Sequence, residues 1–372
     1  MAKVLVMGGF AESLLNFRGA LLQDMVRCGH EVFACAPDEA VGVEEKLCEL
    51  GVTYIPIKLN RTGINPLGDL RFLIALVLLF RSIKPDLFFG YTIKPVIYGS
   101  IAAKISGVPR IYSMITGLGY SFSKETWKSR FVGLISGQLY RIAARFNNHI
   151  FFQNPDDLSV FVNRRIIAGE NKAVLVNGSG VDTKVFNSTP FPKKLSFLLI
   201  ARLIRDKGIY EYAGAARALK KDYPWINFRL AGWIDDNPHS ISKSDLDVWH
   251  ESGDIEFLGR LSDVRPALAD SSVYVLPSFY GEGTPRTVLE AMASGRAVIT
   301  TDSPGCRETV ESGVNGYLIP TRSVDSLVAS MKLFIDRPDL VASMGEASRV
   351  IAEEKYDVRK VNAAMLASMG LS

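Results

Sequence analysis

Two carboxylates that flank a turn in the second half of the chain are the side chains best placed to do chemistry. Glu282 lies in the turn, and Glu290 lies in the helix expected to follow it. If residues 282–290 were helical, the two groups would be about 12 Å apart along the axis. The carboxylates of a retaining glycosidase are about 5 Å apart, so a hydrolase pair is disfavoured. The spacing fits one carboxylate at each end of an elongated ligand, although an acidic residue near a helix start can also simply complement the helix dipole.

The turn itself has the composition of an anion site. Gly281 and Gly283 permit a tight turn, and Pro285 suits the first position of a helix. The backbone N–H groups from Thr284 to Val288 are then expected to face whatever lies above the preceding strand. A helix start of this kind binds anions, and phosphate is the expected guest.

A second set of charged residues follows another predicted strand. Arg202 and Lys207 lie within residues 200–208, where a strand is expected to lead into a helix. A planar guanidinium and a compact ammonium together suit a diphosphate. By themselves they could be ordinary surface charge, but beside the Glu282–Glu290 turn they predict a phosphate-binding pair.

The glycines after the first strand are less specific. Gly8 and Gly9 lie in a turn that lacks the full GxGxxG spacing, which disfavours a dinucleotide oxidoreductase. They fit a loop that closes over a phosphate, and strand–turn–helix packing explains them equally well.

These residues are positioned by short apolar strands that alternate with helical periodicity, which predicts parallel sheets with crossover helices. A Pro- and Lys-containing linker at 189–194 separates two such series. We therefore predict an α/β protein with two Rossmann-like, doubly wound parallel-sheet domains and a ligand site in the cleft between them. The first domain is expected over 1–188 and the second over 189–355. The expected strands are 3–7, 31–35, 52–57, 86–89, 110–114, 148–152, 173–177, 195–200, 226–231, 255–258, 272–276 and 297–300, and the expected helices are 14–28, 41–50, 67–82, 94–106, 127–146, 155–163, 209–222, 263–269, 286–294 and much of 323–370.

Composition narrows the class of partner. The 372 residues are 48% hydrophobic and 22% charged with a net charge of +4, which is typical of a globular protein and not of a disordered one. The first half of the chain is the more basic. This suits binding to an anionic lipid or membrane surface, but basic residues scattered over a solvated protein surface would give the same charge balance. The sequence has no dense run of basic and aromatic residues, so a nucleic-acid partner is disfavoured. The four cysteines show no metal spacing, and no signal peptide or membrane-spanning run is evident, so we expect a cytosolic protein with reduced thiols.

Together with three further motifs, the residues described above make the chain resemble glycosyltransferase family 4, which has the GT-B fold. The motifs are Gly29-His30-Glu31-Val32, Lys84-Pro85-Asp86 and Asn177-Gly178-Ser179-Gly180-Val181-Asp182. The resemblance implies that Arg202 and Lys207 hold the donor diphosphate and act with Glu282, which contacts the donor sugar, while Glu290 binds the ribose. It also implies that residues 356–372 form a helix that returns to the first domain. The donor-binding set it implies is Gly9, Gly259, Leu261, Gly283, Thr284, Pro285, Thr287, Val288 and Glu290.

A narrower resemblance rests on residues 61–66, 91–95 and 115–120. These segments look like those of bacterial transferases that extend sugars on undecaprenyl diphosphate, including the type that adds N-acetylgalactosamine to a diacetylbacillosaminyl lipid. The acceptor-binding residues expected in the first domain are Asn16, Arg18, Arg61, Lys94 and Thr116. Many family members place a histidine after the fifth strand, where this chain has Thr116-Gly117, and none of His30, His149, His239 and His250 falls there.

The reaction implied is a retaining transfer of a hexose or N-acetylhexosamine from a UDP-sugar to a polyprenyl-diphosphate-linked saccharide. The cationic pair and the helix start would stabilise the departing diphosphate, so no metal and no cofactor are expected. The Asp245-Leu246-Asp247 triplet is interpreted as surface. A UDP-sugar 2-epimerase of the same fold and a non-catalytic GT-B partner subunit stay open as alternatives.

Basic and apolar residues alternate at helical spacing in region 120–146. Lys124, Lys128, Arg130, Arg141 and Arg145 are interspersed with Trp127, Phe131, Leu134, Ile135 and Leu139. Such a stripe can rest on a membrane interface or can be core with a solvated face. We favour peripheral contact with the inner face of the cytoplasmic membrane, because a polyprenyl acceptor requires it.

Overall fold

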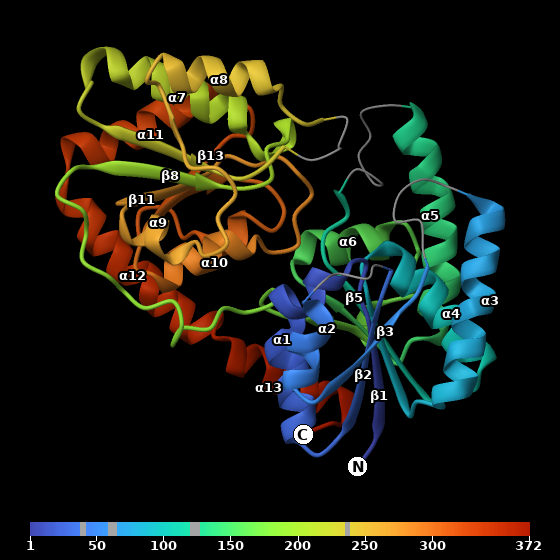
Figure 1. The fold of residues 1–372 in the computed structure, drawn as a ribbon. Coiled ribbons are helices and arrows are strands. Elements are labelled where there is room, and N and C mark those ends of the chain that lie inside the picture. Colours follow the sequence, from blue (N-terminus) through green and yellow to red (C-terminus); the bar gives the residue numbers. More distant parts are fainter. Residues whose placement is uncertain (38–41, 59–64, 120–126, 235–238) are drawn as a thin grey trace. The chain divides into compact units, whose positions relative to one another are not determined.

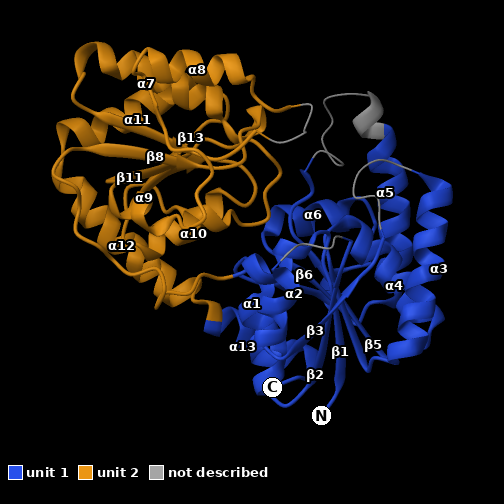
Figure 2. Cartoon of the chain, viewed as in Figure 1, with its two compact units in different colours: residues 1–179, 359–372 blue, residues 180–358 orange. Residues whose placement is uncertain are grey.

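Parallel sheets joined by crossover helices organise the chain, as the alternation of apolar strands with amphipathic segments predicts. The computed structural model describes residues 1–37, 42–58, 65–119, 127–234 and 239–372, with side chains in helix α5 described from residue 131 onward. The chain divides into two units, residues 1–179 with 359–372 and residues 180–358 (Figure 2).

In the described part of the first unit, a seven-stranded parallel sheet has the order β3-β2-β1-β4-β5-β6-β7. A π-helical turn, Pro95–Gly99, begins the segment that continues as α4. The elements of this unit are β1 (Lys3–Met7), α1 (Ala11–Arg27), β2 (Glu31–Ala36), α2 (Val43–Glu49), β3 (Val52–Pro56), α3 (Pro66–Ile83), β4 (Leu87–Tyr91), α4 (Ser100–Ile105), β5 (Arg110–Ile115), α5 (Trp127–Phe146), β6 (His149–Phe152), α6 (Pro155–Asn163), β7 (Ala173–Leu175) and α13 (Val358–Met369).

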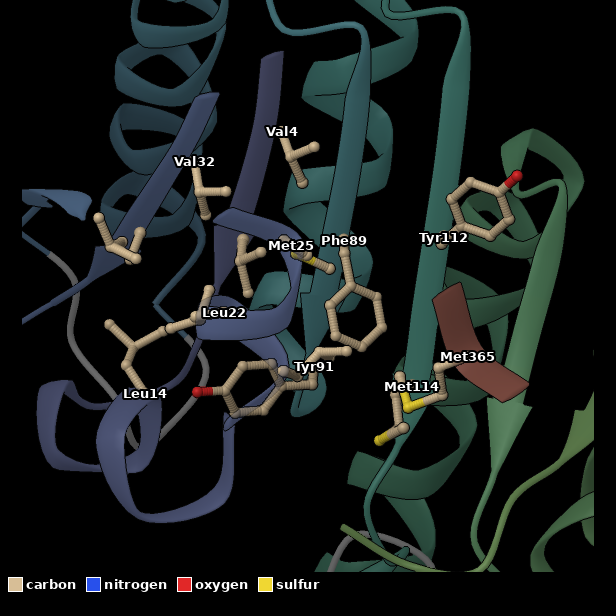
Figure 3. Close-up of a cluster of buried hydrophobic side chains, with 14 of the residues drawn as sticks. Val4, Leu14, Leu22, Met25, Val32, Phe89, Tyr91, Tyr112, Met114 and Met365 are labelled. Carbon is tan, nitrogen blue, oxygen red and sulfur yellow. The ribbon is translucent and has the colours of Figure 1, made fainter. Parts of the chain in front are cut away.

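Alternation along the strands divides this core into two layers, because successive side chains of a strand point to opposite faces. On β1, Val4 and Val6 join one apolar cluster, whereas Leu5 and Met7 join another. Figure 3 shows the first cluster, in which Leu14 and Leu22 of α1 and Met365 of α13 cover the sheet. Helices α1, α2 and α13 therefore line one face, and α3, α4, α5 and α6 line the other.

In the described part of the second unit, a six-stranded parallel sheet has the order β10-β9-β8-β11-β12-β13. Helices α7, α8 and α11 pack on one face, α9 and α10 pack on the other, and α12 reaches both clusters. The elements are β8 (Ser196–Ile200), α7 (Ile209–Asp222), β9 (Asn227–Ala231), α8 (Lys243–Glu251), β10 (Glu256–Phe257), α9 (Arg265–Ala269), β11 (Val273–Leu276), α10 (Arg286–Ala293), β12 (Ala297–Thr301), β13 (Gly316–Ile319), α11 (Val324–Asp336) and α12 (Asp339–Lys355).

The division between the units falls at 179/180 and 358/359, whereas the sequence places it at 188/189 and 355/356. Two contacts explain why residues 180–188 belong with the second unit. The N–H of Val181 donates to the Tyr356 carbonyl oxygen at 2.8 Å, and the Val358 N–H donates to the Val181 carbonyl oxygen at 3.0 Å. Gly180 has φ +70, and a Cβ there would lie 2.6 Å from the Val358 Cα. This crossing of two chain segments depends on sequence-distant residues, and a linker composition does not reveal it.

Among the described strands and α-helices, the edge strand β13 and helix α8 lie outside the sequence predictions. Strand β13 has four residues and begins at a glycine, and a short edge strand carries little period-two signal. Ser242 caps the N-terminus of helix α8, where its side chain accepts a hydrogen bond from the Asp245 N–H at 3.0 Å. The Asp245-Leu246-Asp247 triplet therefore lies on this helix, where the Asp245 carboxylate accepts from the Tyr210 hydroxyl at 2.7 Å.

Candidate functional site

The strand order of the second unit marks one point where a ligand is expected. The chain runs from β8 to β9 and β10 on one side and then returns to β11 on the other side of β8. The loops that leave β8 and β11 therefore diverge, and ligands of open parallel sheets bind beyond the carboxyl ends of strands at such a point. Arg202 and Lys207 follow β8, and Glu282 follows β11.

These two loops are held together by backbone contacts. The N–H groups of Phe279 and Tyr280 donate to the Asp206 carbonyl oxygen at 2.9 and 3.0 Å. Gly208 has φ +76, and a Cβ at this position would lie 2.2 Å from the Pro277 carbonyl oxygen. Only a glycine permits this close approach, so Lys207 is fixed beside the loop that carries Glu282.

Lys207 and Glu282 form an ion pair, although 75 residues separate them. The Ser278 hydroxyl also donates to Glu282 Oε1 at 3.0 Å. The centre of the Tyr280 ring lies 5.2 Å from Lys207 Nζ and 5.8 Å from Arg202 Cζ. The electron-rich ring attracts both cations and brings them close to the same aromatic side chain. Three of the predicted site residues are therefore brought together, and Ser278 and Tyr280 join them.

The loop after β12 packs closely against the turn that carries Glu282 and Gly283. Gly305 has φ +80, and a Cβ there would lie 2.0 Å from the Gly283 carbonyl oxygen. The neighbouring Cys306 is buried, and burial, then the Glu282 carboxylate, raises the pKa of its thiol to about 11. The thiol therefore stays protonated near neutral pH, which excludes a thiolate nucleophile at this position.

Helix α10 carries the second carboxylate. Glu290 accepts a hydrogen bond from Arg286 Nε at 2.8 Å, one helical turn away. Burial raises the pKa of Glu290, Arg286 opposes the increase, and Asp263 adds to it. A buried carboxylate with one cationic partner keeps unused acceptor capacity, as a group that binds a diol requires.

Not every predicted group at the start of α10 is oriented as the sequence suggests. Pro285 precedes the helix without a side-chain cap, but the Val288 N–H donates to the Pro285 carbonyl oxygen at 3.1 Å. Val288 is fully buried, because its side chain packs in the apolar cluster between α10 and the sheet. The Thr287 hydroxyl lies 2.7 Å from the Tyr274 hydroxyl. Thr284 is buried at the start of the helix.

The turn after β10 lies at the same edge of the sheet. Gly259 has φ +69, and its carbonyl oxygen accepts from the Gly232 N–H at 2.9 Å. Arg260 lies over the Trp233 ring at 4.8 Å, and Leu261 packs against the apolar cluster beneath α10. The turn joins the carboxyl ends of β9 and β10.

Of the remaining predicted residues that the structure describes, Gly9 follows β1 and Lys94 follows β4, the two strands at which the first sheet reverses its strand order. Thr92 has φ +69, a backbone conformation that is strained for a β-branched residue. A Cβ on Gly9 would lie 2.6 Å from Thr92 Oγ1. The strain and the close approach both lie where a ligand of this unit is expected.

Lys94 is the most constrained of the predicted acceptor residues. Its ammonium lies 2.8 Å from Asp69 Oδ1, and the Tyr98 hydroxyl donates to Asp69 Oδ2 at 3.0 Å. Arg18 is buried, with its guanidinium 5.1 Å from the centre of the Tyr91 ring.

The other three expected acceptor residues have different settings. Asn16 is exposed on α1, and Thr116 is half-buried directly after β5. Arg61 lies outside the described residues.

The histidines do not take the place of the family histidine. His30 precedes β2, where its Nδ1 accepts from the Ala2 N–H at 3.2 Å. His149 begins β6, and His250 lies on α8. His239 Nδ1 lies 3.1 Å from Asp206 Oδ2, on the loop after β8 that also carries Lys207.

Sequence reasoning did not identify Ser278, Tyr280 and Arg286 as site residues. The spacing of Arg286 and Glu290, four apart on a predicted helix, was the available signal for their ion pair. Ser278 and Tyr280 carry no such signal, because their roles follow from how the loop folds.

Two family descriptions match the chain, one in each half. Residues 22–154 match the glycosyl transferase 4-like family, and residues 181–350 match the glycosyl transferases group 1 family. The N,N'-diacetylbacillosaminyl-diphospho-undecaprenol alpha-1,3-N-acetylgalactosaminyltransferase of Campylobacter jejuni is 27% identical over 338 residues, 87% of each chain. The UDP-Gal:alpha-D-GlcNAc-diphosphoundecaprenol alpha-1,3-galactosyltransferase of Escherichia coli is 25% identical, and the match covers 72% of this chain and 71% of that protein.

Solved structures show the same fold. HepE of Anabaena, in complex with UDP-glucose, has a TM-score of 0.78 at 18% identity, with 100% of both chains covered. Sucrose-phosphate synthase from Thermosynechococcus elongatus has a TM-score of 0.79 at 15% identity, with 98% of this chain and 97% of that chain covered. With two parallel-sheet units, a cation pair at the reversal of strand order and matches along both halves, this chain belongs to the group 1 and 4-like glycosyltransferases of the GT-B fold.

Proposed function

We propose that this glycosyltransferase moves a hexose or an N-acetylhexosamine from a UDP-sugar to a polyprenyl-diphosphate-linked saccharide, with the anomeric configuration retained. The observation that carries the proposal is the group formed by Lys207, Arg202 and Glu282 at the carboxyl ends of β8 and β11. Two cations on one aromatic ring suit a diphosphate, and a carboxylate beside them suits the hydroxyls of the attached sugar.

Each group has a stated task in the reaction. Lys207 and Arg202 bind the diphosphate and stabilise the charge that develops on it as the glycosidic bond breaks. Glu282, held by Lys207 and by Ser278, accepts hydrogen bonds from the donor sugar. Glu290 on α10 accepts hydrogen bonds from the ribose. Gly9, Gly259, Leu261, Gly283, Thr284, Pro285, Thr287 and Val288 complete the proposed donor site.

The acceptor hydroxyl attacks the anomeric carbon on the face from which the diphosphate departs. An oxygen of the leaving phosphate takes the acceptor's proton, so that no protein base and no metal ion is required. Electrostatic stabilisation of the leaving group then supplies the largest part of the rate.

Two relatives support the choice of substrates. The names of the Campylobacter jejuni and Escherichia coli enzymes both specify a sugar on diphospho-undecaprenol as acceptor, and the latter name specifies a UDP-sugar donor. The proposed acceptor site lies in the first unit, with Asn16, Arg18, Arg61, Lys94 and Thr116. Such an acceptor places the enzyme at the inner face of the cytoplasmic membrane. In the described part of the chain, no helix has the length and apolarity needed to cross a bilayer.

The test is transfer by the purified protein from a panel of UDP- and GDP-sugars to a prenyl-diphosphate disaccharide, with nucleotide release and product structure both measured. We expect UDP release that depends on the acceptor and an α-linkage formed from an α-linked donor. Conversion of a UDP-sugar to its 2-epimer without acceptor would replace the proposal with an epimerase. Inverted linkage would refute the retaining mechanism.

A further inference from the structure

Helices α3, α4 and α5 lie side by side on one face of the first unit and expose many large apolar side chains. Helix α3 packs against α4, and α4 packs against α5 (Figure 1). On α3, Leu67, Leu70, Ile74 and Leu78 are 52–72% exposed. Their spacing of three and four residues places them in one stripe along the helix. The neighbouring helices also expose large apolar side chains, Ile105 on α4 and Phe131, Leu134 and Ile142 on α5.

The charges on these three helices are sorted by sign. The exposed ionisable side chains in the described part of the three helices are Arg71, Arg81, Lys104 and Arg145, all cationic. Neither α4 nor α5 contains an aspartate or glutamate. The single carboxylate of α3 is Asp69, which is buried and paired with Lys94 on the inner side of the helix.

We propose that this α3–α4–α5 face docks on an anionic lipid bilayer. The inference rests on the proposed function for the identity of the acceptor, and it adds the partner surface on which the enzyme finds that acceptor. Leucine, isoleucine and phenylalanine side chains would enter the acyl boundary, while the arginine and lysine heads reach lipid phosphates. It extends the contact expected for residues 120–146 to α3 and α4.

A second copy of the chain fits this face poorly. If the face paired with itself, cations would be set against cations, with no exposed carboxylate in the described part of these helices to offset them. An isolated leucine on a surface requires no explanation, but an apolar stripe does when the exposed charges in the described part of its helices are all cationic. Lipid headgroups supply both the negative charge and the apolar layer that the face lacks.

The position of α3 also places the bilayer near the proposed acceptor site. Asp69 contacts Lys94 from the inner side of the helix, and a helix with its side chains is about 10 Å across. A bilayer on the outer side would therefore lie about one helix diameter from Lys94. A diphosphate anchored in that bilayer is within reach of the lysine without leaving the headgroup region.

The docking test is vesicle flotation without substrate. The test variant combines Leu70→Ser, Ile74→Ser and Leu78→Ser, and the matched control combines Val248→Ser, Val314→Ser and Val350→Ser, which are exposed apolar positions of the second unit. We expect the unmodified chain and the control to float with phosphatidylglycerol-containing vesicles. The test variant should bind at least about 10-fold less, because it lacks three exposed apolar side chains that would enter the bilayer. Arg71→Glu with Arg81→Glu should reduce binding to anionic vesicles and leave binding to pure phosphatidylcholine vesicles unchanged.

Several outcomes would overturn the inference. Failure of the unmodified chain to float would do so, as would equal flotation of the leucine and isoleucine variant with an unchanged melting temperature. Dimers that this variant disperses, seen by analytical ultracentrifugation, would assign the face to a second copy. Transfer to a short-chain, water-dispersed acceptor without vesicles separates the two proposals: flotation without transfer refutes the proposed function alone, and transfer without flotation refutes the docking face alone.

Discussion

Replacing Lys207 with alanine removes a charge that serves both the proposed reaction and the folded state. In the absence of donor, its ammonium pairs with Glu282, and the two side chains are only 13% and 10% exposed. Loss of one preorganised group that stabilises developing charge typically lowers kcat by about 10²–10³-fold, or about 2.7–4 kcal/mol. We expect Lys207→Ala to reduce transfer by at least about 100-fold on this basis.

The same substitution should also cost stability. Glu282 would lose its ion pair with Lys207 and keep the hydrogen bond from the neutral Ser278 hydroxyl at 3.0 Å. Removing the cationic partner of a mostly buried carboxylate is destabilising by about 1–3 kcal/mol. Adding Glu282→Gln removes that charge, so the double variant should recover much of the lost stability while remaining inactive. A double-mutant cycle separates the two effects.

The measurements are acceptor-dependent UDP release and urea unfolding for the wild type, both single variants and the double variant. Lys221→Ala, an exposed lysine of α7 in the same unit, is the control and should change neither quantity. Lys207→Ala with half the wild-type rate would remove Lys207 from the catalytic set. Equal destabilisation by the single and double variants would show that the ion pair does not stabilise the unit.

Three further expectations follow from other contacts. Burial raises the pKa of Glu290 above its ordinary value. The ionised carboxylate therefore destabilises the fold, and this cost is absent below the ordinary pKa and grows as the pH rises through the raised pKa. Glu290→Gln should increase the melting temperature more at pH 8 than at pH 5, and it should weaken UDP binding measured by calorimetry. Asp69→Asn should raise the KM for a diphosphate-linked acceptor with little change in kcat, because Lys94 loses its anchor, and Asp69→Glu should partly restore that KM. EDTA should leave turnover unchanged, and loss of activity that Mg²⁺ or Mn²⁺ restores would contradict the metal-independent mechanism.

Local sequence was sufficient for most elements because their signals are short-range. Helix α5 over Trp127–Phe146 and helix α7 over Ile209–Asp222 match the expected bounds, since amphipathic periodicity extends along each. The parallel α/β class followed from the alternation of such helices with apolar strands. The segment expected as a helix over 94–106 is helical but contains a π-helical turn at Pro95–Gly99, which periodicity alone does not reveal.

Part of the candidate site could also be predicted from short-range sequence signals. Arg202, Lys207 and Glu282 each follow a predicted strand, and parallel strands bring their carboxyl ends to one edge of a sheet. Residue type and position after a strand were therefore enough to nominate them.

What only the tertiary structure decided are the partners of these groups. The pairing of Lys207 with Glu282 and of Lys94 with Asp69 joins residues from separate elements, and neither pair has a periodic signal along the chain. The inward orientation of Asp69, which leaves the outer face of α3 without a carboxylate, likewise depends on how that helix is rotated against the sheet. A sequence specifies which side chains are available, but the packing of helices on sheets determines which of them meet and which remain at the surface.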